Sequence, residues 1–222
     1  MSHRIHDPAF LAARFRCNGS ARDSSGHGNH GTLVNAPTWG VFNKGLKTAL
    51  ELDGDDAYVS LGTTQVLSSV SAFTLCGWVN QNVIGTHDRI FFQHEDGDNN
   101  IILQTDGGPV MEIFVENGGD GYGSFDYSTV VSAHSWHHVA VVFDGSQATN
   151  ATRLLLYIDG VPMALAFTGT IQATTPDLTG DIAVIGTPTF SFDGRLYDFR
   201  IYSVPLSRQE IMTIQHEPVG VL

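Results

Sequence analysis

Glu112 and Glu116 are the residues whose spacing comes closest to that of a catalytic acid and nucleophile. They flank Ile-Phe-Val, so both side chains share one face of a β-strand, as the two carboxylates of a glycoside hydrolase would. Phe114 lies between them on that face, and an apolar ring neither orients nor tunes a carboxylate. A retaining enzyme needs its two carboxyl groups about 5–5.5 Å apart, which this spacing on a flat strand does not give. We therefore expect no enzymatic activity and two solvent-facing glutamates.

Two loops have residues suited to binding a cation. Asp23-Ser-Ser-Gly-His-Gly-Asn29 offers a carboxylate, an amide and glycines that let backbone carbonyls turn inward, and calcium prefers about six to eight such oxygen ligands. Asp96-Gly-Asp-Asn-Asn100 resembles the start of an EF-hand loop. However, Ile101 stands at its sixth position in place of glycine, and no glutamate stands at the twelfth. We expect a solvated hairpin loop at the second segment.

Four aromatic residues outside the most apolar strands are candidates for ligand binding. Trp39 follows Ala-Pro-Thr, and Tyr122, Phe125 and Tyr127 follow a glycine-rich loop. Phe125 and Tyr127 share one face of a predicted strand. Stacking on sugar rings is one interpretation and contact with a protein is the other, because exposed aromatic residues serve both.

The cysteines and the paired histidines give weaker signals. Cys17 and Cys76 would form a disulfide only if their Cα atoms came within about 7 Å. Cys76 lies in an apolar run, which favours a buried, inert thiol. His137 and His138 are adjacent on a predicted strand and face opposite sides, so they do not readily bind one metal ion together.

Alternating apolar and polar residues dominate the chain from about residue 46 onward, a pattern typical of β-strands. The predicted strands cover residues 46–52, 57–61, 73–79, 89–93, 101–104, 110–115, 121–127, 136–143, 153–158, 161–167, 181–185 and 194–202. Asp159-Gly160 separates two of them and predicts a tight hairpin. One helix is predicted near Ser207–Gln215, because Ser207 and Glu210 form a capping box.

Composition limits the classes of partner. The chain has 222 residues, of which 42% are hydrophobic, and its 11 Lys and Arg against 23 Asp and Glu give a net charge of −12. That charge would repel a nucleic-acid backbone, and no apolar run approaches the roughly 18 residues of a membrane span. A dozen strands need two sheets to cover their edges. We predict a single all-β domain over 1–222, a two-sheet antiparallel jelly-roll sandwich with one short C-terminal helix.

Six segments occur in a characteristic order. They are NGSARDSSGHGNHG (18–31), GLKTALELDG (45–54), FTLCGWV (73–79), WHHVAVVFDG (136–145), LYIDG (156–160) and GRLYDFRIY (194–202). In this order they resemble the laminin-G-like, concanavalin A-like lectin/glucanase domains, over about residues 9–215. The resemblance implies a jelly roll of two curved sheets, often with one structural calcium ion, and it puts Trp78 and Trp136 in the core.

The resemblance also implies that the loop at Asp23 lies near the last long strand, where Asp198 stands among apolar residues. A buried, unpaired aspartate costs several kcal/mol, so Asp198 needs a cation or hydrogen-bond donors. We therefore expect a structural Ca²⁺ at Asp23, Asn29 and Asp198. The alternative is that Asp23 caps a turn while Asp198 accepts backbone hydrogen bonds or pairs with an arginine.

These observations favour a non-catalytic recognition or adhesion protein that binds a glycan or a protein surface, outside the cell or on a virion. The main rival is a structural decoration or fibre protein of a phage or other particle. A degenerate family-16-like glucanase is a third, because Glu112 and Glu116 resemble the two glutamates of that signature, although Phe114 stands where the signature has its central Asp. The N-terminal arm, residues 1–8, precedes the resemblance. With Phe10, its Ile5 and Pro8 could contact a second copy or a capsid, or the arm could cover an edge of its own sheet.

Overall fold

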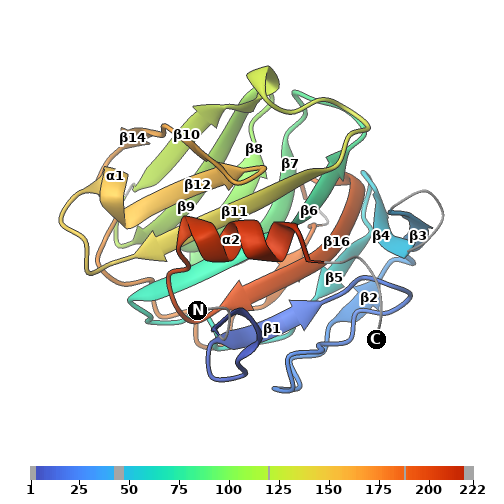
Figure 1. Ribbon diagram of the computed structural model, residues 1–222, viewed down its shortest axis with the longest axis horizontal. Coiled ribbons are helices and arrows are strands. Elements are labelled where there is room, and N and C mark those ends of the chain that lie inside the picture. Colours follow the sequence, from blue (N-terminus) through green and yellow to red (C-terminus); the bar gives the residue numbers. More distant parts are fainter. Residues whose placement is uncertain (1–3, 43–47, 120, 188, 218–222) are drawn as a thin grey trace.

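Two antiparallel sheets face each other across an apolar core in the computed structural model, which describes residues 4–42, 48–119, 121–187 and 189–217 (Figure 1). Sheet A runs in the order β13 (Val161–Met163), β12 (Leu154–Ile158), β11 (His137–Asp144), β6 (Ala72–Gln81), β16 (Asp193–Tyr202), β4 (Thr48–Asp53) and β3 (Thr38–Val41), with β1 (Leu11–Phe15) beside β16. Sheet B runs in the order β14 (Ala166–Thr168), β10 (Tyr122–Asp126), β9 (Val110–Asn117), β8 (Asn99–Thr105), β7 (Asp88–Asp96), β15 (Ala183–Ile185), β5 (Tyr58–Ser60) and β2 (Thr32–Val34). The predicted jelly-roll sandwich is confirmed.

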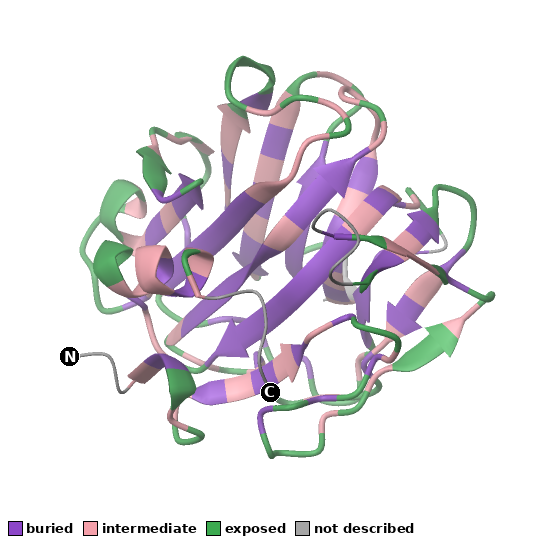
Figure 2. Ribbon diagram, turned by 45° about the vertical axis from the view of Figure 1, so that its right-hand side comes forward, coloured by how far each residue is buried: buried purple, intermediate pink, exposed green. Residues whose placement is uncertain are grey.

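The core lies between the sheets because every second residue of the long strands points inward. Leu75 lies opposite Val141 in sheet A, and both are buried against Ile113 and Leu103 of sheet B in one cluster. Figure 2 shows this burial concentrated on the long central strands. The hairpin between β12 and β13 turns at Asp159 and Gly160, both with positive φ, as two-residue hairpins require.

The outer face of sheet A is covered by α2 (Arg208–Gln215), which lies across its central strands (Figure 1). Ile211 and Ile214 of α2 pack with Tyr202 and Cys76 of the sheet. Ser207 accepts a hydrogen bond from the Glu210 amide, and the Glu210 carboxylate accepts one from the Ser207 amide at 2.8 Å. The predicted capping box and helix are therefore confirmed.

The N-terminal arm forms a 3-10 turn, η1 (Arg4–His6), beside this helix. Ile5 is only 1% exposed and belongs to the same apolar cluster as Ile211. It therefore has no surface to offer a second molecule, and the expected contact through Ile5 is wrong. Pro8 is exposed and Phe10 is partly exposed, with the Arg4 guanidinium 5.5 Å from the Phe10 ring.

Two tryptophans expected in the core lie outside it. Trp78 and Trp136 are partly exposed and pack with Phe42 and Tyr197 on the outer face of sheet A. The Phe42 ring stacks on Tyr197 with 4.0 Å between ring centroids and meets Trp136 edge-on at 4.7 Å. Trp78 takes this position because it alternates with Val79 and Gly77, so its side chain points away from the other sheet.

Five features differ from the sequence-based prediction. The short strands β1, β2 and β3 precede residue 46, where no strand was predicted. The predicted strand 161–167 is two strands, because β13 pairs with β12 in sheet A whereas β14 pairs with β10 in sheet B. A four-residue helix, α1 (Asn150–Arg153), begins at Thr149, whose partner in its capping box is Thr152.

Among the helices that the structure describes, none is long and apolar enough to cross a membrane.

Candidate ligand-binding face

The outer face of sheet B carries an apolar row that crosses five neighbouring strands. Tyr122, Phe114, Ile102, Phe92 and Val184 lie directly opposite one another from β10 through β9, β8 and β7 to β15. We call these five residues the aromatic row. None of them belongs to the clusters that form the core, so the row faces away from sheet A. The Phe114 and Tyr122 rings stack with 4.8 Å between centroids.

Hydrogen-bonded polar side chains flank the aromatic row on both sides. On one side Arg89 donates from Nε to Gln104 Oε1 at 3.0 Å, and Gln104 donates from Nε2 to Glu112 Oε2 at 2.9 Å. On the other side Asn100 donates to Glu116. His94 lies opposite Asn100, and its ring stacks on Phe92 at 5.4 Å. Tyr122, Phe114 and Phe92 are partly exposed along this row, whereas Ile102 and Val184 are buried. The partly exposed rings therefore lie between two hydrogen-bonded polar lines.

A β-bulge in β7 sets the position of Arg89. The register shifts between Arg89 and Phe91, where Ile90 and Phe91 both turn into the core. Bulges re-aim the side chains beside them. Here the bulge puts Arg89 on the outer face with Phe92, whose ring centroid is 4.6 Å from the guanidinium carbon. The Phe190 ring centroid lies 4.7 Å from the same guanidinium carbon, and this ring stacks on His87 at 3.9 Å.

The predicted aromatic ligand residues divide between this face and the core. Tyr122 lies on the face, whereas Phe125 lies opposite Met111 and packs on the core. Tyr127 is 0% exposed and accepts a hydrogen bond from the Gly85 amide at 3.2 Å. Trp39 lies opposite Leu50 on β3 and also packs on the core. Tyr127 is therefore a correction, since a fully buried side chain has no surface for a ligand. Phe125 and Trp39 are partly exposed but lie off the outer face of sheet B, so they stay predictions.

Sequence reasoning missed Phe92 and Arg89 as members of this face. Phe114 was noted only as an obstacle to catalysis, although its position between Glu112 and Glu116 was the available signal. The two carboxylates lie at register positions four residues apart, roughly 13 Å along the strand. Each is hydrogen-bonded to an amide of β8, to Gln104 and Asn100 respectively. Glu116 is buried rather than solvent-facing, which corrects that part of the expectation.

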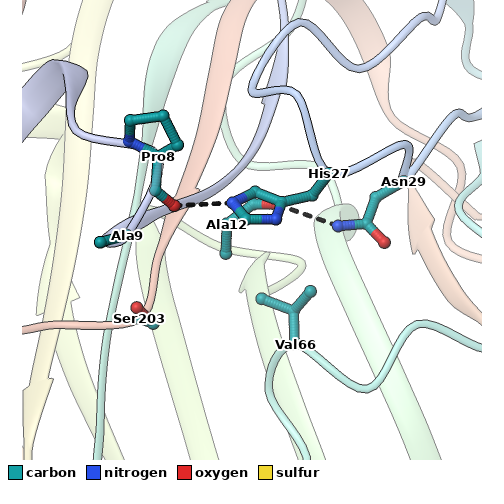
Figure 3. Close-up of a pocket in the computed structure, with 7 residues that line it drawn as sticks. All are labelled: Pro8, Ala9, Ala12, His27, Asn29, Val66 and Ser203. Carbon is teal, nitrogen blue, oxygen red and sulfur yellow. Dashed lines mark hydrogen bonds between the residues drawn. The ribbon is translucent and has the colours of Figure 1, made fainter.

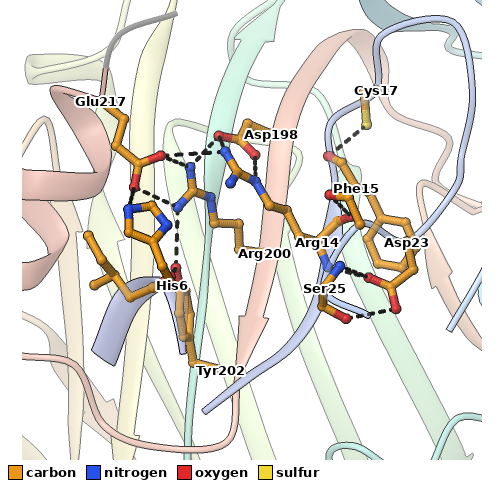
Figure 4. Close-up of polar contacts among 12 residues, drawn as sticks. His6, Arg14, Phe15, Cys17, Asp23, Ser25, Asp198, Arg200, Tyr202 and Glu217 are labelled. Atoms are coloured by element: carbon orange, nitrogen blue, oxygen red, sulfur yellow. Dashed lines mark hydrogen bonds and ion pairs between the residues drawn. The ribbon is translucent and has the colours of Figure 1, made fainter. Parts of the chain in front are cut away.

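Asp198, the central residue of the expected calcium site, is bound by two arginines (Figure 4). Arg14 donates from Nε to Asp198 Oδ1 at 2.7 Å and from Nη2 to Oδ2 at 2.9 Å. Arg200, which is 0% exposed, donates to Asp198 and to Glu217. Burial alone would raise the pKa of Asp198, but Arg200 and Arg14 lower it to about 2. Arginine pairing, the stated alternative, is what the structure contains.

Asp23 and Asn29 make local hydrogen bonds instead. The Asp23 carboxylate accepts backbone N–H groups from Arg14 at 2.9 Å, Ser25 at 2.8 Å and Asn29 at 3.0 Å. Burial would raise the pKa of Asp23, and these amides hold it below its ordinary value. Asn29 donates from Nδ2 to Ala12 O at 2.9 Å beside a pocket of about 380 Å³, where His27 Nε2 lies 2.6 Å from Pro8 O (Figure 3).

The three residues do not fit a calcium ion together. Both oxygens of Asp198 face guanidinium groups, which would repel a cation, and both oxygens of Asp23 already accept hydrogen bonds. Within the described ranges no three His, Cys, Asp or Glu side chains gather as a metal site requires. The Arg14 guanidinium supplies the positive charge that the sequence assigned to a metal ion.

The cysteines and the histidine pair are not reactive groups of this face. Cys17 and Cys76 are free and buried, and burial raises the pKa of each thiol to about 12. His137 Nδ1 lies 2.8 Å from Asp159, whereas His138 is buried on the outer face of sheet A, with its ring 5.4 Å from Trp78.

Solved structures with this fold include several binding domains. Domain 4 of an extracellular arabinanase from Geobacillus stearothermophilus, in complex with arabinotriose, is 21% identical, with 92% of this chain and 97% of that chain covered and a TM-score of 0.69. The botulinum neurotoxin serotype D binding domain is 15% identical over 95% of this chain, and the binding domain of Paraclostridial mosquitocidal protein 1 is 15% identical over 93%; both have TM-scores of 0.69. The chain spans about half the length of these two toxin domains, with 51% and 52% covered. At these identities the likeness shows the fold alone.

Sequence comparison identifies the family. No curated protein matches the chain. Residues 53–212 match the concanavalin A-like lectin/glucanases superfamily, and this segment runs from the end of β4 into α2. The chain belongs to the concanavalin A-like lectin/glucanases superfamily.

Proposed function

We propose that the protein binds a glycan, without catalysis, on the outer face of sheet B. The observation that carries the proposal is the aromatic row with a hydrogen-bonded polar line on each side. Sugar rings present C–H groups on their faces and hydroxyl groups around their edges. Aromatic rings pack on the C–H faces, and carboxylates and amides hydrogen-bond to the hydroxyl groups. A row that crosses five strands suits a chain of sugars better than a single small molecule.

The arrangement of Glu112 and Glu116 supports binding rather than hydrolysis. Roughly 13 Å of strand separates the two positions, whereas the carboxyl groups of inverting enzymes are about 6.5–9.5 Å apart and those of retaining enzymes closer still. Phe114 lies between the two glutamates and stacks with Tyr122. The partly exposed Glu112 carboxylate, held by Gln104, is suited to accept hydrogen bonds from sugar hydroxyls, whereas Glu116 is buried.

The fold comparison adds limited support. The arabinanase domain, solved with arabinotriose, shares the fold of nearly the whole chain. A protein partner is the competing occupant, because protein interfaces are also enriched in aromatic residues and arginine. The carboxylate–amide pairs on both sides of the row favour the sugar. Sugar hydroxyl groups can hydrogen-bond to these pairs, whereas the apolar side chains of a protein partner cannot.

A glycan array followed by titration calorimetry with the strongest oligosaccharide tests the proposal. Tyr122→Ala and Phe92→Ala each remove one ring of the aromatic row, and we expect each to weaken binding about five- to tenfold. Trp136→Ala is the matched control, because Trp136 is a partly exposed aromatic residue on the outer face of sheet A. Absence of any bound oligosaccharide, or loss of binding only in Trp136→Ala, would refute the proposal.

A further inference from the structure

Arg89 is held in a fixed orientation at one end of the proposed glycan-binding face. Its guanidinium carbon lies 4.6 Å from the Phe92 ring centroid and 4.7 Å from that of Phe190. Its Nε donates to Gln104 at 3.0 Å, and its backbone amide donates to Phe190 O at 2.9 Å. These contacts use one side-chain donor and leave the terminal Nη groups as the part of Arg89 that is suited to a ligand.

Arg89 has no ion-pair partner among the described residues, unlike the three arginines whose guanidinium groups lie closest to carboxylates. Arg14, Arg195 and Arg200 each pair with a carboxylate within 2.9 Å, but no ion pair of the described residues includes Arg89. Burial lowers the pKa of Arg89. A partly desolvated charge without a partner is unfavourable, and a bound anion would relieve that cost.

We propose that the ligand is an acidic saccharide whose carboxylate binds the Nη groups of Arg89 while neighbouring rings of the chain lie on the aromatic row. This inference rests on the proposed function and names its ligand class. A guanidinium matches a planar carboxylate with two parallel hydrogen bonds. Contacts with Phe92 and Phe190 already order the Arg89 side chain, so little side-chain freedom is lost when the carboxylate binds.

The negative charges of the protein do not oppose this arrangement at close range. Glu112 is separated from Arg89 by Gln104, which hydrogen-bonds both, and Glu116 lies on the opposite side of the aromatic row, paired with Asn100. The chain has a net charge of −12, and exposed charges farther away than about 8–10 Å are largely screened at physiological salt. The attraction to the carboxylate is therefore local to Arg89.

Matched acidic and neutral probes test the inference. Uronic-acid oligosaccharides are compared by calorimetry with the same oligosaccharides after carboxyl reduction, which keeps the rings and removes the charge. We expect the acidic form to bind at least tenfold more tightly. Arg89→Gln should abolish that preference, and Arg89→Lys should retain part of it.

The outcomes separate this inference from the proposed function. If the native protein binds acidic and neutral forms equally, and Tyr122→Ala weakens both, glycan binding stands and the role of Arg89 is refuted. If neither form binds and no other oligosaccharide does, both proposals fail. A preference for the acidic form that survives in Arg89→Gln also overturns the inference, because the carboxylate then binds elsewhere.

Discussion

At the scale of single residues, Arg14 stands where a metal ion was expected. It joins the two parts of the expected site, because its backbone amide donates to Asp23 and its guanidinium binds Asp198. The charge balance around Asp198 is completed by Arg200 and Glu217. Because the Arg14 guanidinium is part of the chain, this region needs no calcium ion from the medium. Its stability depends on Arg14 instead.

Arg14→Leu tests that dependence. It removes one partner from a buried ion pair and leaves Asp198 with Arg200 alone. We expect the free energy of unfolding to fall by roughly 3 kcal/mol, measured by urea denaturation. Arg22→Leu is the control, because Arg22 is exposed. A chelator should leave the melting temperature of the native protein unchanged; a clear decrease would show that a calcium ion contributes after all.

His138 makes the stability of the protein depend on pH. Burial first, and then the charge of Arg200, lower the pKa of His138 to about 4, and neither ring nitrogen has a hydrogen-bond partner among the described residues. In the unfolded chain the imidazole titrates near about 6.5. Between these two values the unfolded state binds a proton that the folded state does not. The free energy of unfolding should therefore fall by about 3 kcal/mol as the pH drops from 6.5 to 4.

Denaturation at a series of pH values, with His138→Phe beside the native protein, measures this effect. The variant should lose most of the decrease between pH 6.5 and 4, since it has no group that titrates at that position. His134→Gln, at an exposed site, should keep the native slope. An unchanged slope in His138→Phe would assign the pH dependence to other groups.

At the scale of elements, α2 is the helix whose boundary the sequence specifies most closely. Ser207 and Glu210 satisfy each other's amides, and the helix covers the outer face of sheet A with Ile211 and Ile214. Ser207→Ala should lower the free energy of unfolding by about 1 kcal/mol in thermal or urea denaturation. Thr213→Ala, within the same helix, should have a smaller effect. Equal losses in both variants would mean that the cap does not fix the helix.

Strand β9 carries the residues that separate binding from hydrolysis. The spacing of Glu112 and Glu116, with Phe114 between them, leads us to expect no release of reducing sugar from β-glucans by the native protein. The measurement is a reducing-sugar assay on concentrated protein. Turnover that disappears in Glu112→Gln or Glu116→Gln would contradict the account of this strand.

At the scale of the whole molecule, the fold was predictable because its signals are local and repeated. Alternation along the chain indicated the long strands, and Ser207 and Asp159-Gly160 indicated the helix and the hairpin. Strands β2 and β3 were missed because three or four residues at a sheet edge contain too little alternation. The division of residues 161–167 between two sheets was also hidden, since sheet membership depends on partners far away in sequence.

The site was less predictable because it depends on which face of a strand each residue takes. Tyr122 and Phe125 are three residues apart on β10 and point in opposite directions, one outward and one into the core. Arg89 and Phe92 share a face only because of the bulge between them, and the sequence of β7 contains no pattern that predicts this bulge. Arg14 is distant from Asp198 in sequence, so its role as the partner of that carboxylate became visible only in three dimensions.

The central claim, that the outer face of sheet B binds sugar, is tested most directly by mapping a bound oligosaccharide on the protein with NMR. Amide and aromatic signals would be followed while the strongest oligosaccharide from the array is added. The account predicts that the largest shifts cluster at Phe92, Ile102, Phe114 and Tyr122, with small changes at Trp78 and Trp136 on the opposite sheet. Shifts concentrated at Trp78 and Trp136, or at the pocket beside His27, would contradict it.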